Sequence, residues 1–165
     1  MGQYDNVDFS ELIALSDAEV VTHSYVREVQ LESGRVLALV TLDNDLDHTR
    51  PNTLGPRTLM ELDTVLLELA NRASRGEIQG VAVTGKPYFL AAGADLSRVA
   101  DIPSKAVARK LAELGHRALG RLSEIGVPSF VFVNGLALGG GLEIALNAHY
   151  RTIDSSAPAI ALPEV

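Results

Sequence analysis

Three consecutive glycines, Gly139, Gly140 and Gly141, lie between an apolar segment and an acidic residue, Glu143. Glycine permits sharp backbone bends and lets the main chain approach a bound group without an intervening Cβ. The helix expected after the glycines offers unpaired N–H groups and the positive end of its dipole, which suit an oxygen that acquires negative charge. The pattern predicts half of an oxyanion hole with an acid/base residue beside it.

A second run of small residues precedes Asp95 and Leu96, in the sequence Ala91-Ala92-Gly93-Ala94-Asp95-Leu96. Taken alone, this run favours a tight turn in which Asp95 caps the segment that follows, and a lone glycine triplet favours a packing turn. The two runs each follow a predicted buried strand, and ligands of α/β sheets gather at the carboxyl ends of strands. Together they predict two loops that each direct one backbone amide at the same carbonyl oxygen.

The elements that must position these loops follow from the spacing of apolar residues. Leucines at three- and four-residue steps predict amphipathic helices, and short β-branched runs predict strands. Strands that alternate with helices imply an α/β layered fold. The expected elements are a leader helix around 9–15, a hairpin of strands at 26–31 and 36–42, a helix from 56, a strand at 80–84, a loop at 86–95, a helix over 107–122, a strand at 129–133 and a helix at 142–149.

Composition excludes several classes of protein. The 165 residues suffice for one domain with a core, and 47% hydrophobic with 21% charged residues is ordinary for a globular chain. A net charge of -7 argues against a nucleic-acid binder, and the absence of cysteine excludes disulfides, thiolate nucleophiles and Cys-based zinc sites. No apolar run approaches a membrane span, and the acidic start is neither a signal peptide nor a presequence, so we expect a cytoplasmic protein.

Other motifs are incomplete. The run from Gly80 to Lys86 departs from a phosphate loop at Pro87, and the glycine run departs from a dinucleotide fingerprint at Ile144. The four histidines are scattered and form no His-Glu-x-x-His pair, so no metal site is expected. No Gly-x-Ser-x-Gly elbow supports a serine hydrolase.

The two small-residue runs together resemble a known family. Ala91 to Leu96 combined with the segment from Asn134-Gly135 to Glu143 is similar to the paired signature of the crotonase (enoyl-CoA hydratase/isomerase) superfamily, and Pro163-Glu164-Val165 to its second-glutamate segment. The resemblance implies a leader at 1–25 and, at 26–165, the N-terminal portion of a crotonase-like (ββα)n spiral core. It is closest to the hydratase part of multifunctional fatty-acid β-oxidation enzymes, in which a dehydrogenase region follows. The end at Val165, directly after a new apolar stretch, suggests a fragment.

The resemblance also implies roles for individual residues. The backbone N–H groups of Ala94 and Gly140 are expected to form the oxyanion hole for a CoA thioester. Glu143 is expected to activate water for attack at C3, and Glu164 to deliver a proton to C2; alone, each would be interpreted as a helix-start or loop acid. The expected substrate-binding residues are Ala92, Gly93, Asp95, Leu96, Gly139, Gly141 and Pro163.

The expected reaction is reversible hydration of a trans-2-enoyl-CoA, without a metal or redox cofactor. The presence of both glutamates favours the hydratase over the isomerase branch, which usually keeps only the second. Alternatives are isomerisation, thioester hydrolysis or decarboxylation of acyl-CoA, and an inactive acyl-CoA-binding fragment. By resemblance, the full-length protein forms a trimer-based homo-oligomer. Lys86, Arg98 and Lys105 are candidates for binding the CoA phosphates, although a solvated surface role is favoured for each. His149 stands where the family commonly has an acidic residue, and we expect this difference to affect packing at the helix end rather than the chemistry.

Overall fold

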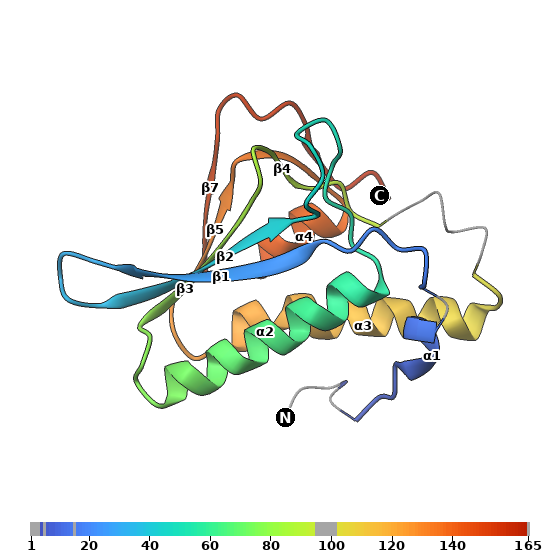
Figure 1. Cartoon of the computed structure of the whole chain (residues 1–165), viewed down its shortest axis with the longest axis horizontal. Helices are drawn as coiled ribbons and strands as arrows, with labels where there is room; N and C mark the ends of the chain where they lie inside the picture. The colour runs from blue at the N-terminus through green and yellow to red at the C-terminus, as the bar shows by residue number, and fades with distance from the viewer. Residues whose placement is uncertain (1–3, 5, 15, 95–101, 165) are drawn as a thin grey trace.

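The computed structural model describes residue 4 and residues 6–14, 16–94 and 102–164 (Figure 1). Strands and helices alternate along most of this chain, as an α/β fold requires. In chain order the elements are α1 (Ser10–Ala14), β1 (His23–Gln30), β2 (Val36–Asp43), α2 (Pro56–Ser74), β3 (Gly80–Gly85), β4 (Tyr88–Ala91), α3 (Lys105–Glu124), β5 (Ser129–Val133), β6 (Gly135–Leu138), α4 (Gly140–Asn147), β7 (Tyr150–Ile153) and β8 (Ile160–Ala161).

The strands form two sheets. The larger sheet has the order β1-β2-β3-β5-β7, in which the β1–β2 hairpin is antiparallel and the other pairs are parallel. The smaller sheet has the order β4-β6-β8 and is parallel throughout. Successive strands therefore alternate between sheets, since β3, β5 and β7 are followed directly by β4, β6 and β8. This repeat is the (ββα) spiral predicted from the resemblance.

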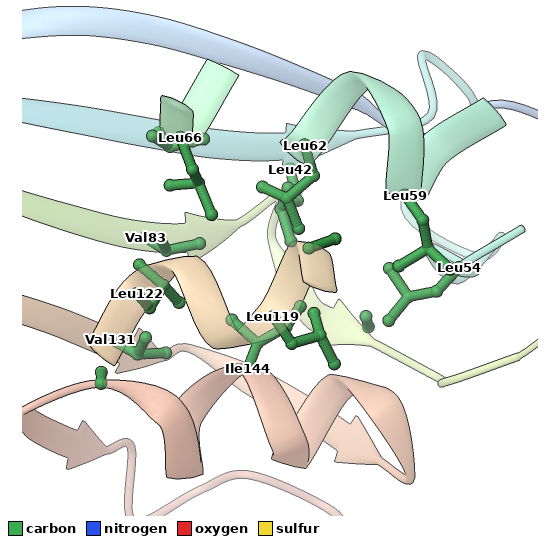
Figure 2. Close-up of a cluster of buried hydrophobic side chains, with 14 of the residues drawn as sticks. Leu42, Leu54, Leu59, Leu62, Leu66, Val83, Leu119, Leu122, Val131 and Ile144 are labelled. Carbon is green, nitrogen blue, oxygen red and sulfur yellow. The ribbon is translucent and has the colours of Figure 1, made fainter. Parts of the chain in front are cut away.

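The core lies between the larger sheet and the helices. In Figure 1, α2 and α3 run beneath β1, β2 and β3. Apolar side chains every three or four residues give α2 one buried face, and the burial of these leucines drives the packing. Figure 2 shows side chains of β2, β3, β5, α2, α3 and α4 meeting in one cluster, among them Leu42, Leu62, Leu66, Val83, Leu122, Val131 and Ile144.

The strongly periodic elements were predicted correctly, whereas four short strands were missed. The helix that begins at Pro56, the long helix before 124 and the strands β2, β3 and β5 match the expectation. The predicted loop at 86–95 is wrong over Tyr88–Ala91, which forms β4, and β6, β7 and β8 were not foreseen. Strands of two to four residues are too short to develop an alternating pattern.

Helix α4 spans Gly140–Asn147, two residues earlier at each end than predicted. The Arg151 guanidinium satisfies carbonyls at its C-terminal end, donating to Ala145 (3.0 Å) and Ala148 (3.0 Å). Directly after the helix, the N–H of His149 donates to Ser129 Oγ (3.0 Å), and the N–H of Ser129 donates to His149 Nδ1 (3.1 Å). His149 therefore packs at the helix end, as expected.

The leader supplies the N-terminal cap of α2. Glu19 accepts hydrogen bonds from the backbone N–H groups of Arg57 (2.8 Å) and Thr58 (3.0 Å), which the helix itself leaves unpaired. We expect Glu19→Ala to lower the free energy of unfolding by about 0.5–2 kcal/mol, the usual range for a lost cap. Urea unfolding followed by circular dichroism measures this change. The control Glu68→Gln alters an exposed acid on α2 and should change stability little; equal losses in both variants would contradict the assigned cap.

Candidate active site

The two small-residue loops follow strands β4 and β6, not β3 and β5 as the sequence suggested. These two strands are parallel neighbours in the smaller sheet, with Phe89 beside Leu136 and Ala91 beside Ala137. Their carboxyl ends therefore lie next to each other, at the place where α/β proteins bind ligands. The two loops lie side by side as predicted, but they follow strands of the smaller sheet rather than of the larger one.

The two loops touch through their backbones. A Cβ at Gly93 would lie 2.8 Å from the carbonyl oxygen of Leu138 and 3.4 Å from the nitrogen of Gly140. A Cβ at Gly141 would lie 2.1 Å from the carbonyl oxygen of Ala91. Gly93 also has φ of +82°, a conformation that favours glycine. Glycine is therefore required at these positions to bring the loops into contact.

The amides of Ala94 and Gly140 are the two proposed donors. Ala94 is exposed, and Gly140 begins α4, where the first N–H groups have no partner within the helix. In the part of the chain that the structure describes, neither amide donates a hydrogen bond to a protein acceptor. Two unpaired donors on adjoining loops suit an oxygen on which charge develops.

Both predicted catalytic carboxylates flank the glycine run. A Cβ at Gly140 would lie 3.7 Å from Glu143 Oε2, and a Cβ at Gly139 would lie 3.4 Å from Glu164 Oε2. Glu143 lies in the first turn of α4. The backbone N–H of Glu143 donates to the carbonyl of Gly139 (2.9 Å). Glu164 follows β8, which is fixed beside β6 by the bond from Gly139 N–H to Ala161 O (2.9 Å).

A cavity of about 550 Å³ joins these groups. Both glutamates, both amide-bearing residues and four of the predicted substrate-binding residues line it: Ala92, Gly93, Ala94, Gly139, Gly140, Glu143, Pro163 and Glu164. Gly141 is not in the lining because it is packed against Ala91. Asp95 and Leu96 lie outside the described residues, as does Arg98.

The opposite wall of the cavity was missed at the sequence level. It is formed by α3 and by the chain around the start of α2, with Leu54, Leu59, Leu111, Ala112, Gly115, His116 and Leu119. In Figure 2, Leu54 and Leu59 lie side by side at one end of the buried cluster. The four-residue steps from Leu111 to Gly115 and Leu119 were the available signal, but they adjoin the apolar stripe assigned to the core. His116, which sequence reasoning set aside, lies on this wall with its ring 6.1 Å from that of Tyr4.

Lys86 is neither a phosphate ligand nor a solvated residue. Its side chain is buried, and its ammonium group donates to Asn44 Oδ1 and to the carbonyls of Leu46 (2.9 Å) and Asp47 (3.2 Å). It fixes the loop after β2. Lys105 is exposed at the start of α3. Within the described ranges, no group of three or more metal-ligating side chains forms, and no helix is long and apolar enough to cross a bilayer.

Comparison with known proteins identifies relatives of the chain. The model of a family described as enoyl-CoA hydratase/isomerase matches residues 32–165. The chain is 39% identical over 139 residues to the fatty acid oxidation complex subunit alpha of Pseudomonas syringae pv. tomato, and 40% identical over 140 residues to that of Pseudomonas savastanoi pv. phaseolicola. Each match covers 82% of this chain and 18% of the relative, so the chain spans less than a fifth of these relatives.

Solved structures match the fold. Pseudomonas aeruginosa DspI superposes with a TM-score of 0.66 at 31% identity, covering 86% of this chain and 54% of DspI. An enoyl-CoA hydratase from Bacillus anthracis superposes with a TM-score of 0.66 at 23% identity, covering 84% of this chain and 49% of that one, a likeness that shows the fold alone. The crotonase-like α/β fold predicted from the resemblance is confirmed.

Proposed function

The chain belongs to the enoyl-CoA hydratase/isomerase family, and we propose that its own reaction is the reversible addition of water to a trans-2-enoyl-CoA. The product is a 3-hydroxyacyl-CoA, as in fatty-acid β-oxidation. One observation carries the proposal: a single cavity is lined by two carboxylates and by two amides that donate to no acceptor among the described residues. Hydration needs both pairs, because charge develops on the thioester oxygen, one proton leaves the water whose oxygen bonds to C3, and one proton is added to C2.

In this proposal the amides of Ala94 and Gly140 bind the thioester carbonyl oxygen. Attack of water at C3 shifts the electrons of the double bond toward that oxygen, giving an enolate. Donors that are already fixed stabilise this charge without reorganisation, and removing one such donor typically raises a barrier by about 3–4 kcal/mol. Backbone donors make the site depend on the conformation of the two loops rather than on side-chain identity.

The two glutamates move the protons. Glu143 holds the water and accepts its proton as the oxygen bonds to C3, while Glu164 gives a proton to C2. One carboxyl group must start ionised and the other protonated, which is the arrangement that general acid–base catalysis requires. The first turn of α4 carries Glu143 near Gly140, and the pairing of β8 with β6 brings Glu164 near Gly139.

The remaining features of the protein are proposed from the same chemistry. The amides can polarise the carbonyl, so the reaction requires no metal or redox cofactor, and the CoA thioester is the only ligand. We propose a cytoplasmic enzyme that binds neither nucleic acid nor membrane, with a leader at 1–25, a crotonase-like domain from 26 and a trimer-based homo-oligomer as its assembly.

The wild-type protein tests this assignment against the other reactions of its family. Three substrates of equal chain length are supplied separately: a trans-2-enoyl-CoA, a 3-enoyl-CoA and a saturated acyl-CoA. We expect kcat/KM to be highest for the trans-2-enoyl-CoA. Its hydration is monitored by the loss of the absorbance of the conjugated double bond. Faster conversion of the 3-enoyl-CoA would assign an isomerase, release of free CoA a thioester hydrolase, and binding without turnover an acyl-CoA-binding protein.

A further inference from the structure

Asn52 is a fully buried asparagine outside the cavity lining, with an exposed fraction of 0%. Its carboxamide nitrogen donates to the carbonyl of Leu42 (2.8 Å) and to the carbonyl of Leu90 (3.1 Å). Its carboxamide oxygen accepts from the N–H of Asn44 (3.1 Å). Leu42 belongs to β2 and Leu90 to β4, so one side chain joins the larger sheet to the smaller one.

The backbone around Asn52 also holds the first of the two active-site loops. The N–H of Ala92 donates to the carbonyl of Asn52 (2.8 Å), and the N–H of Leu54 donates to the carbonyl of Gly93 (2.9 Å). These bonds fix the two residues directly before Ala94. Because the backbone of Gly93 touches that of Leu138 and Gly140, the same bonds fix the first loop against the second.

We propose that Asn52 is a positioning residue that sets the place of the Ala94 amide relative to the Gly140 amide. The inference rests on the proposed function, since it assigns a task to these amides. Asn52 acts through the backbone of Ala92 and Gly93 and touches no substrate. A misplacement of about 1 Å in such a site typically costs on the order of a hundredfold in rate.

The chemistry of the position requires a carboxamide. Two carbonyls need donors and one N–H needs an acceptor, and a terminal amide supplies both kinds of group. An aspartate of the same shape keeps the acceptor but loses both donors and directs negative charge at two carbonyl oxygens. Asn52→Asp therefore changes the hydrogen bonding at nearly constant volume.

The surroundings make this anchor rigid. Asn44, whose N–H reaches Asn52, donates through its own side chain to the carbonyl of Pro51 (2.9 Å) and accepts from the buried ammonium of Lys86. Asp43 lies 3.8 Å from the same ammonium. The loop from β2 to Asn52 is thus fixed at both ends, so a displacement of Asn52 is passed to Ala92 and Gly93 through their backbone bonds with Asn52 and Leu54.

Enzyme kinetics on the native protein tests the proposal. We expect Asn52→Asp to lower kcat for crotonyl-CoA hydration by roughly ten- to a hundredfold and to change KM less, since the cavity wall formed by α3 does not include the displaced loop. Isotope-edited infrared spectra should show a weaker downshift of the bound thioester carbonyl. The control Ser129→Ala removes a buried hydroxyl bonded to Leu122 O (2.8 Å), away from the cavity, and should lower stability while kcat stays normal.

Hydrogen exchange supplies a measurement that does not depend on activity. The amides of Ala92 and Leu54 must exchange slowly in the wild-type protein and faster in Asn52→Asp, but not in Ser129→Ala. If the wild-type protein binds acyl-CoA without hydrating it, the proposed function fails, while exchange and carbonyl spectra still test Asn52. Fast wild-type exchange at either amide, or a folded Asn52→Asp with normal kcat and carbonyl shift, would overturn the inference. If Asn52→Asp does not fold, Asn52→Ser, which keeps one donor, should show the same changes to a smaller degree.

Discussion

Glu143→Gln and Glu164→Gln are each expected to lower kcat for crotonyl-CoA hydration by about 10²–10⁴-fold, the usual contribution of general acid–base catalysis. Glutamine preserves the shape and hydrogen bonding of the side chain but can neither accept the proton of the attacking water nor deliver one to C2. Each glutamate is at the cavity surface and not in the core, so both variants should fold normally. Steady-state rates together with thermal melting curves measure the two effects separately.

A third glutamine variant controls for loss of charge. Glu113 lies on α3, outside the cavity lining, and pairs with Arg109 one turn away (3.0 Å). Glu113→Gln should retain the wild-type rate. Because Glu143 and Glu164 are proposed to act in one step, the double variant should be little slower than the slower single variant. A normal rate in either single variant would remove that residue from the proposed mechanism.

Gly141→Ala is expected to separate the two loops and destabilise the protein. The added Cβ would lie 2.1 Å from the carbonyl oxygen of Ala91, and a backbone atom cannot rotate away as a side chain can. We expect a loss of about 3 kcal/mol in the free energy of unfolding, at the upper end of overpacking effects. Chemical denaturation measures this loss. The remaining folded protein should be at least about a hundredfold slower, because Gly140 moves with its neighbour.

The matched control is another helical glycine. Beyond its chain neighbours and its own helix backbone, no atom of the described residues lies within 4 Å of a Cβ placed at Gly120 on α3, so Gly120→Ala replaces a poor helix former without a clash. That variant should gain up to about 1 kcal/mol and keep its activity. If Gly141→Ala were as stable and active as Gly120→Ala, the close approach of the two loops would have no part in catalysis.

The local signals of the site were strong in the sequence. Gly139 to Gly141 and Ala91 to Ala94 combine small residues with a following acid, and the structure places part of each run, Gly139–Gly140 and Ala92–Ala94, in the lining of one cavity. The amphipathic pattern of α2 and the hairpin before it were also predictable, since each is long enough to show its period. Each of these features is indicated by residues that are close together in the sequence.

The missed features depend on residues far apart in the chain. Strands β4 and β6 have four residues each, and they form a sheet only because the spiral brings them together. Lys86 carries the signal of a surface lysine, yet it is buried because the carbonyls of Leu46 and Asp47 surround its ammonium group. The cavity-lining residues of α3 belong to an apolar pattern that, in sequence, is typical of a core-facing helix. Only the folded position of the two loops shows that these residues line a cavity. Such features follow from tertiary packing, which composition and periodicity do not contain.

The most direct measurement follows the oxygen atom of water. The wild-type protein is incubated with a trans-2-enoyl-CoA in water labelled with heavy oxygen, and the products are separated and examined by mass spectrometry. The proposed mechanism predicts one labelled oxygen at C3 of an intact 3-hydroxyacyl-CoA. Label found only in a free carboxylic acid, or a shifted double bond without any label, would contradict the assignment of this site to hydration.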